Sequence, residues 1–211
     1  MSHDAVTGRE VRIEFDGTRC IHSRHCVLGH PDVFVPNAPG GWIHPDAASA
    51  EEVMHVVQQC PSGALVAVRR DGGPQEQAPK VNTVRVLENG PLAVRAALTV
   101  RGAPSGFRAT LCRCGQSANK PFCDGAHAKA GFTATGEPAT QDSTALDKRD
   151  GPLDLRPVPN GPLHVVGAME IISGTGRTVQ RGTEAWLCRC GQSKNKPFCD
   201  GSHKAAGFIA A

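Results

Sequence analysis

The chain has 211 residues, enough for one large domain or several small ones, and its formal net charge of +3 is too mild to indicate a nucleic-acid-binding protein. Aromatic residues make up only 4% of the sequence and tyrosine is absent, so a single core lacks many of its usual large anchors. Small modules of this composition usually depend on bound metal or on disulfides. The nine cysteines fall into three groups of three, and an odd number in each group argues against a self-contained disulfide framework.

The N-terminal residues, MSHDAVTGRE, lack the apolar stretch of a signal peptide, and no run of the sequence approaches the roughly 18 apolar residues of a membrane span. We therefore expect no membrane association. A reducing compartment, most simply the cytoplasm, follows as the expected location, because thiols stay free there to bind metal.

Residues 9–70 are expected to form one domain. Apolar and charged residues alternate from Val11 to Phe15, which predicts a half-buried strand, and Ala64–Val68 predicts a second one. The polar stretch 71–80, rich in glycine, proline and glutamine, is interpreted as a linker.

A helix is predicted between these two strands. It would start at Asp46 or Ser49 and run to about Gln59, and Ser49 and Glu52 have the spacing of a capping box. Strands and a helix in this arrangement predict a small α+β domain.

The rest of the sequence is an internal repeat. Residues 112–127 (CRCGQSANKPFCDGAH) and 188–203 (CRCGQSKNKPFCDGSH) differ at two positions only, and each is preceded by Asn-Gly-Pro-Leu-x-Val, at 89–94 and 160–165. The β-like runs between phrase and motif are Leu92–Val100 and Leu163–Ile172. The expected boundaries are 81–135 for the first repeated unit, 136–158 for a partly irregular connector, and 159–211 for the second unit.

Each motif gathers three cysteines and a histidine. Cys112 and Cys114 lie two positions apart, which places both side chains on one face if the backbone is an extended strand. Cys123 and His127 lie four apart, on one face of a helical turn that Asp124 could cap. The same four ligands recur in the second copy as Cys188, Cys190, Cys199 and His203.

Zinc accepts three thiolates and one imidazole, so a structural zinc site is one interpretation of the motif. Zinc sites usually pair their cysteines at C-x2-C or wider, whereas here the spacing is C-x-C followed by an eight-residue gap. Catalysis by a nucleophilic cysteine would not require three thiols and a histidine, repeated almost verbatim.

The motif CRCGQSxNKPFCDG[AS]H resembles the CDGSH iron–sulfur domain of the NEET proteins and their bacterial relatives, over its full length in both copies. Ala126 replaces the serine of the family name in the first copy. The resemblance implies a [2Fe–2S] cluster in each copy, with the C-x-C cysteines on one iron and the Cys/His pair on the other. It also implies a β-rich tandem that packs as an internal pseudo-dimer, and hence a monomeric protein.

The residues next to the expected ligands can be interpreted in two ways. Repeated basic residues would form either a solvated rim or a charge that balances the cluster and steers an acidic partner. Repeated serines could donate hydrogen bonds to cluster sulfur, and the two tryptophans are interpreted as core residues. The basic residues are Arg113, Lys120, Arg189 and Lys196, the serines Ser117 and Ser193, and the tryptophans Trp42 and Trp186.

The remaining cysteines, Cys20, Cys26 and Cys60, keep the spacing of a bacterial ferredoxin run from which the middle cysteine is missing, and Ser23 occupies that position. With Pro61 after Cys60, residues 9–70 resemble the divergent mono-cluster ferredoxin domain often joined to CDGSH units. The resemblance implies one [3Fe–4S] or [4Fe–4S] cluster; three buried structural thiols are the alternative.

Three thiolates leave the fourth corner of a cubane cluster without a cysteine. That corner would face Ser23, or else His22 or His25. Serine oxygen is a poor ligand for sulfide-bound iron, so we expect a [3Fe–4S] cluster in aerobically prepared protein. Ligation by either histidine would overturn that expectation.

We therefore expect a multi-cluster redox protein that passes electrons, or whole clusters, to a redox protein partner. No set of residues indicates a substrate pocket, so we do not expect an enzyme. The alternatives are a module that senses redox state or pH, and a zinc-stapled interaction protein.

Overall fold

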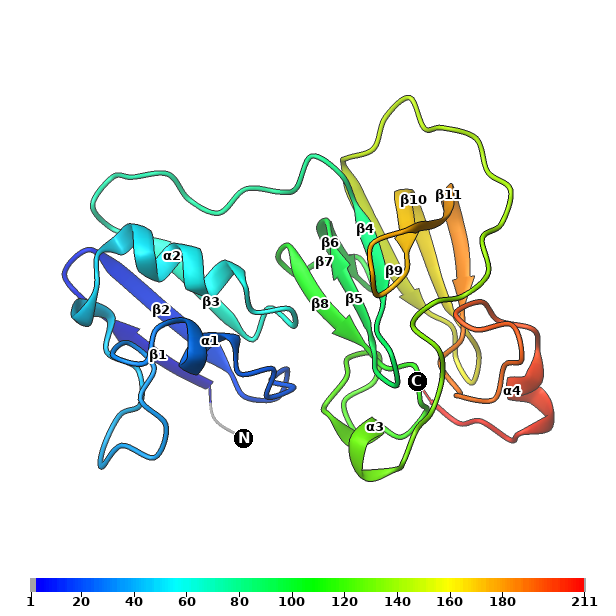
Figure 1. The fold of residues 1–211 in the computed structure, drawn as a ribbon, viewed down its shortest axis with the longest axis horizontal. Helices are drawn as coiled ribbons and strands as arrows, with labels where there is room; N and C mark the ends of the chain where they lie inside the picture. The colour runs from blue at the N-terminus through cyan, green and yellow to red at the C-terminus, as the bar shows by residue number, and fades with distance from the viewer. Residues whose placement is uncertain (1–2, 211) are drawn as a thin grey trace. The chain divides into compact units, whose positions relative to one another are not determined.

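The computed structural model describes residues 3–210, which fall into two units, one up to Gln77 and one from Ala78 (Figure 1). Both are rich in strands and carry only short helices, as the α+β expectation requires. Among the described residues, no helix is long and apolar enough to cross a membrane.

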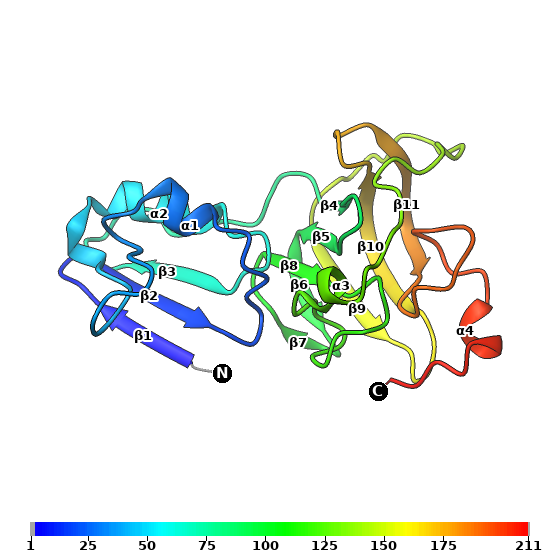
Figure 2. The same ribbon diagram turned by 60° about the horizontal axis from the view of Figure 1, so that its bottom comes forward.

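The first unit is built on a three-stranded antiparallel sheet in the order β1-β2-β3. Figure 2 shows α1 and α2 on one side of this sheet, and buried residues of β2 and α2 meet there in one core. The elements are β1 (His3–Thr7), β2 (Val11–Asp16), α1 (His25–Gly29), the 3₁₀ turn η1 (Pro45–Ala47), α2 (Ala50–Gln58) and β3 (Leu65–Arg69). Both predicted strands and the predicted helix are confirmed.

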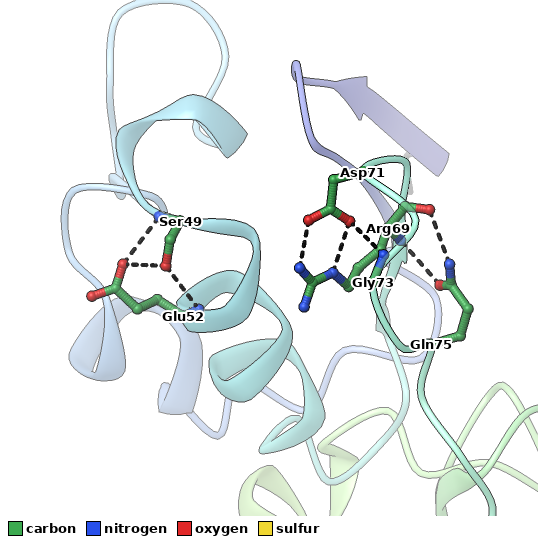
Figure 3. A network of polar contacts seen from close by, with 6 residues as sticks. All are labelled: Ser49, Glu52, Arg69, Asp71, Gly73 and Gln75. Carbon is green, nitrogen blue, oxygen red and sulfur yellow. Dashed lines mark hydrogen bonds and ion pairs between the residues drawn. The ribbon is translucent and has the colours of Figure 1, made fainter.

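The capping box of α2 is confirmed in detail. The Glu52 amide donates to Ser49 Oγ at 3.3 Å, and the Ser49 amide donates to Glu52 Oε2 at 3.0 Å (Figure 3). These two bonds satisfy amides that the first helical turn leaves without partners.

The start of the stretch predicted as a linker folds back onto the end of β3. The Arg69 amide donates to Gln75 Oε1 at 3.0 Å, and Gln75 Nε2 returns a bond of 2.9 Å to the Arg69 carbonyl (Figure 3). Asp71 pairs with the Arg69 guanidinium and accepts the Gly73 amide at 3.1 Å. Residues 69–75 therefore form an ordered turn.

The second unit is one large sheet to which both repeats contribute. Its strands follow the order β7-β6-β9-β10-β4-β5-β8, and β11 pairs with β10. The strands are β4 (Thr83–Val86), β5 (Leu92–Arg95), β6 (Ala97–Val100), β7 (Ala103–Pro104), β8 (Arg108–Leu111), β9 (Pro152–Pro157), β10 (Leu163–Ile172) and β11 (Thr178–Leu187). The short helices are α3 (Ala126–Lys129) and α4 (Ser202–Ala205).

One expectation about these strands needs correction. The first β-like run is broken at Ala96 into β5 and β6, although the Ala96 amide still donates to the Phe107 carbonyl beside β8. The connector 136–158 is partly irregular, as expected, and its end forms β9, which pairs with β10 on one side and β6 on the other.

The two repeats exchange strands reciprocally. β9 precedes the shared phrase of the second repeat as β4 precedes that of the first. β9 lies parallel to β6 of the first repeat, and β4 lies parallel to the end of β10 of the second. Counted from the shared Asn-Gly-Pro-Leu phrase, β6 and the end of β10 are equivalent segments. One buried apolar cluster spans both repeats, and it consists almost entirely of aliphatic side chains.

The two tryptophans differ in how deeply they are buried. Trp42 packs against the core of the first unit, edge-on to Phe15 with ring centroids 4.9 Å apart. The expectation of a core position is wrong for Trp186, which is 46% exposed. It lies on the outer strand β11 and stacks on His164 at a centroid distance of 3.9 Å.

The capping box gives a first prediction. Replacing Ser49 with alanine removes the acceptor for the Glu52 amide, and loss of such a cap typically costs ~1 kcal/mol. Urea unfolding of the first unit, followed by Trp42 fluorescence in a Trp186→Phe background, should report this loss in the free energy of unfolding. Glu51→Gln, in the same turn but outside the box, is the control, and equal losses in both variants would contradict the assignment.

Candidate metal centres

The C-x-C cysteines lie just past the end of a strand. β8 ends at Leu111, so Cys112 and Cys114 belong to the turn that follows, and the expectation that they lie on an extended strand is wrong. Gly115, with φ of +82°, reverses the chain immediately afterwards. The two sulfurs nevertheless lie 3.8 Å apart.

The cysteine and histidine of the second half are brought together by a helical turn. Gly125 has a left-handed φ of 84° and is the N-cap of α3, which carries His127. His127 Nδ1 lies 3.3 Å from Cys123 Sγ. The second copy repeats the pair, with His203 Nδ1 at 3.4 Å from Cys199 Sγ, and its C-x-C sulfurs lie 3.7 Å apart.

Asp124 ties the two halves of the motif together. Its carboxylate accepts the Ala118 amide at 2.8 Å and the Ala126 amide at 3.0 Å, so it joins the loop to the first turn of α3 from the position before the N-cap. Partial burial works to raise the pKa of Asp124, but these hydrogen bonds outweigh it and the pKa is lowered. Asp200 makes the equivalent bonds in the second copy.

Backbone amides point at the thiols. The Gln116 amide donates to Cys114 Sγ at 3.4 Å, and the Gly125 amide donates to Cys123 Sγ at 3.4 Å. The second copy has the same two contacts at 3.4 and 3.5 Å. Hydrogen bonds of this kind stabilise a thiolate and tune a metal bound to it.

Burial and proximity act on the acidity of the thiols. The hydrogen bond from Cys114 lowers the pKa of Cys112 to about 6, while the same pairing raises the pKa of Cys114. Burial raises the pKa of Cys123 to about 11. Without a cation, therefore, the first motif ionises one thiol readily and resists ionising the other two. A metal, which binds the thiolate form, removes that resistance.

The spacing within each pair fits a tetrahedral metal ion. Two thiolates on one such ion, with metal–sulfur bonds of about 2.3 Å, lie about 3.8 Å apart, and a thiolate and an imidazole nitrogen lie about 3.5 Å apart. The sulfur–sulfur distances of 3.8 and 3.7 Å and the sulfur–nitrogen distances of 3.3 and 3.4 Å agree with these values. Residues 3–210 contain no group of three such side chains that could hold one ion together. Each motif offers two close pairs of candidate ligands, one of two cysteines and one of a cysteine and a histidine.

Of the two interpretations of the repeated basic residues, the solvated rim does not hold for Arg113 and Arg189. They are only 1% and 2% exposed, and Arg113 donates to the carbonyls of Gly90 at 2.8 Å and Thr135 at 3.0 Å. Arg189 makes the equivalent bond to Gly161 at 3.0 Å. The arginine between the two cysteines is therefore a buried anchor in both copies.

Ser117 does not direct its hydroxyl proton to a cysteine. It donates to the Phe122 carbonyl at 2.6 Å and accepts the Asn119 amide at 3.0 Å. Ser193 donates in the same way to the Phe198 carbonyl at 2.7 Å. The expected hydrogen bond to cluster sulfur is wrong for both serines, which instead fix the loop before the third cysteine.

The three N-terminal cysteines line one cavity of about 750 Å³ together with His22 and Ser23. Burial raises the pKa of Cys20 and of Cys26, and the charge of Cys60 adds to both shifts, which places the three thiols around a common space.

His22 lies beside one of these thiols. Its Nδ1 lies 3.9 Å from Cys20 Sγ, and its φ of 54° is left-handed, which is uncommon for a residue other than glycine. His25 is instead the first residue of α1 and does not line the cavity.

Comparison with known proteins identifies iron-binding domains in both units. A family model described as an iron-binding zinc finger of the CDGSH type matches residues 89–128 and 160–204, and a model described as a divergent 4Fe-4S mono-cluster matches residues 6–70. The uncharacterized protein YjdI of Escherichia coli, in strains K12 and O157:H7, is 38% identical over 60 residues, which cover 28% of this chain and 76% of the relative. The chain thus contains two CDGSH-type iron-binding segments behind a divergent 4Fe-4S mono-cluster domain.

Proposed function

We propose that this protein is an electron carrier with two [2Fe–2S] clusters, one in each CDGSH motif, and one cluster of three or four irons at Cys20, Cys26 and Cys60. The observation that carries the proposal is the division of each motif into two ligand pairs, at 3.8 and 3.3 Å in the first copy. Two pairs suit two irons, whereas zinc requires all four ligands around one ion.

The ligands assigned to the first cluster are Cys112 and Cys114 on one iron and Cys123 and His127 on the other, and the second copy follows the same assignment. When bound, each cluster supplies one-electron oxidation and reduction. The residues around it set how easily it is reduced. A neutral imidazole in place of a thiolate removes one negative charge, and the amides that point at the sulfurs stabilise the ligands' charge; both raise the potential.

We further propose that the two repeats form an internal pseudo-dimer and that the protein is a monomer. The reciprocal pairing of β9 with β6 and of β4 with β10 supports this, as does the single core shared by both repeats. A second chain is not needed to complete the sheet.

The same proposal includes a redox protein as partner, the absence of enzymatic activity and a cytoplasmic location. Its support is chemical: the residues gathered at the three centres are thiols and imidazoles suited to iron. A reducing compartment keeps such thiols available.

The metal content tests the proposal directly. Anaerobically purified protein should be red-brown and contain about seven or eight irons per chain, the sum of the three clusters. Cys20→Ser should remove only the irons of the N-terminal cluster. Four irons in the unmodified protein would mean that the N-terminal cysteines are structural, and stoichiometric zinc would end the iron–sulfur proposal.

Carrier function is tested by cycling the same preparation. Dithionite should deliver one electron to each cluster, and a one-electron acceptor should remove it again with no change in iron content. Irreversible loss of iron to an added apo-ferredoxin during such cycles would indicate cluster transfer instead.

The histidine ligands predict sensitivity to acid. Burial lowers the pKa of His127, so the ring stays neutral to a pH below the free value of about 6.5, and further acidification protonates it and abolishes ligation. Visible absorbance should therefore be lost as the pH falls. The double variant His127→Cys and His203→Cys should lose it more slowly and show lower potentials. Equal acid sensitivity in the double variant would contradict histidine ligation.

The fourth corner of the N-terminal cluster gives a further prediction. Ser23 occupies the place of the missing cysteine and lines the cavity, so Ser23→Cys should fix a four-iron cluster. Oxidised protein should show the EPR signal of a [3Fe–4S] cluster, and the variant should lose that signal, because oxidised [4Fe–4S] and [2Fe–2S] clusters are silent. An EPR-silent unmodified protein with a full set of irons would show that another residue already holds the fourth iron.

A further inference from the structure

The first CDGSH centre contains a buried hydroxyl group that the fold leaves unused. Thr110 is 1% exposed, and its Oγ1 has no hydrogen-bond partner among residues 3–210. A buried hydroxyl without a partner costs free energy, because it has given up its hydrogen bonds to water. Such groups are rare in folded proteins, and one beside a binding site is explained by a partner that arrives with the bound group.

Backbone pairing places Thr110 opposite one of the assigned cluster ligands. Leu111 and Phe122 form an antiparallel bridge, and at the next position along the pair the Cys123 amide donates to the Thr110 carbonyl at 2.8 Å. Thr110 and Cys123 are therefore directly opposite each other in this register. The side chains of such a pair lie on the same face, with Cβ atoms roughly 5 Å apart.

The face that these two side chains share is turned away from the core. Ala109 and Leu111, the neighbours of Thr110 along β8, belong to the buried aliphatic cluster, so the Thr110 side chain lies on the opposite face of the strand. Cys123 lies on that face as well, and Cys123 and His127 are the ligands assigned to one iron. The unused hydroxyl is thus on the same side of the strand pair as this half of the first centre.

The second copy has no hydroxyl at the equivalent position. The Cys199 amide donates to the Trp186 carbonyl at 2.8 Å, so Trp186 takes the place of Thr110, and its ring stacks on His164. Cys199 is only partly buried, whereas Cys123 is 2% exposed. Two motifs with the same ligands therefore differ in the residue opposite their third cysteine.

Hydrogen bonds to the sulfurs of an iron–sulfur cluster favour its reduced form, which carries one more negative charge. We propose that the Thr110 hydroxyl donates a hydrogen bond to a sulfur of the first [2Fe–2S] cluster, so that this cluster has a higher reduction potential than the cluster of the second motif. The first electron taken up by the two CDGSH centres then resides on the first cluster. The inference rests on the proposed function, because it requires a [2Fe–2S] cluster in both motifs.

Thr110→Val tests the proposal, because valine replaces the hydroxyl with a methyl group of similar size. His203→Cys is introduced first to lower the potential of the second cluster, so that a dithionite titration followed by EPR separates two steps. In that background, Thr110→Val should shift the upper step downward and leave the lower step in place. Thr110→Ser, which keeps the hydroxyl, should leave both steps in place. The second cluster of the same molecule is the control.

A second measurement reports the hydrogen bond itself. With only the first cluster reduced, proton ENDOR should show one exchangeable proton coupling fewer in Thr110→Val than in the Thr110→Ser variant or in the protein with threonine. A threonine with a purely structural role would give no such difference. Thr110→Ala serves for both measurements if the valine variant does not fold.

An unchanged upper step in a folded Thr110→Val variant would overturn the proposal, as would shifts of equal size in both clusters. A serine variant that shifts as far as the valine variant would also overturn it. Iron content separates the two proposals: iron-free unmodified protein defeats the proposed function, whereas full iron content with an unchanged upper step defeats only the role of Thr110.

Discussion

The main electrostatic constraint on the second unit is that two thiols lie close together in a buried turn. Cys112 and Cys114 have sulfurs 3.8 Å apart, and both residues are almost fully buried. Two thiolates in that position repel each other, and burial penalises their charge further. A bound metal, backbone amides and a buried guanidinium can each compensate this negative charge. The motif provides the amides and the arginine, and its thiols and histidine can bind the metal.

The architecture brings two such turns to one place. β8 and β11 both end immediately before a C-x-C pair, and the reciprocal strand exchange fixes these ends with respect to each other. A core of small aliphatic side chains suffices, because the sheet is held by pairing between repeats as well as within them. The scarcity of aromatic residues is thus compatible with a well-packed unit. Glycine after each cysteine pair then permits close backbone contact between these turns, because a methyl group at Gly115 would come within 2.6 Å of the Cys190 carbonyl oxygen.

The sequence predicted those features whose partners are near in the chain. The capping box of α2 needs only Ser49 and Glu52, three residues apart, and the Cys123–His127 pair needs one helical turn. By contrast, the acceptors of Arg113 lie 21 to 26 residues away, so its burial could not be read from its neighbours.

Strand β9 and the exposure of Trp186 were missed for a related reason. The pairing of β9 is set by β6 and β10, one of which belongs to the other repeat. Trp186 is exposed because it alternates with the buried Ala185 and Leu187 along β11, so its side chain lies on the opposite face of the strand. Which of the two faces is covered depends on how the whole sheet packs.

Near-identical motifs also lie in different surroundings. The amide of the third cysteine bonds at 2.8 Å to the Thr110 carbonyl in the first copy and to the Trp186 carbonyl in the second. The backbone role is the same, but Thr110 is 1% exposed, whereas Trp186 is 46% exposed and stacks on His164, which pairs with Glu184 at 2.6 Å. The motif therefore fixes the ligands of both centres alike. Differences in polarity and solvent contact between them arise from the strands that precede the motif, and these are the factors that tune a cluster's potential once its ligands are set.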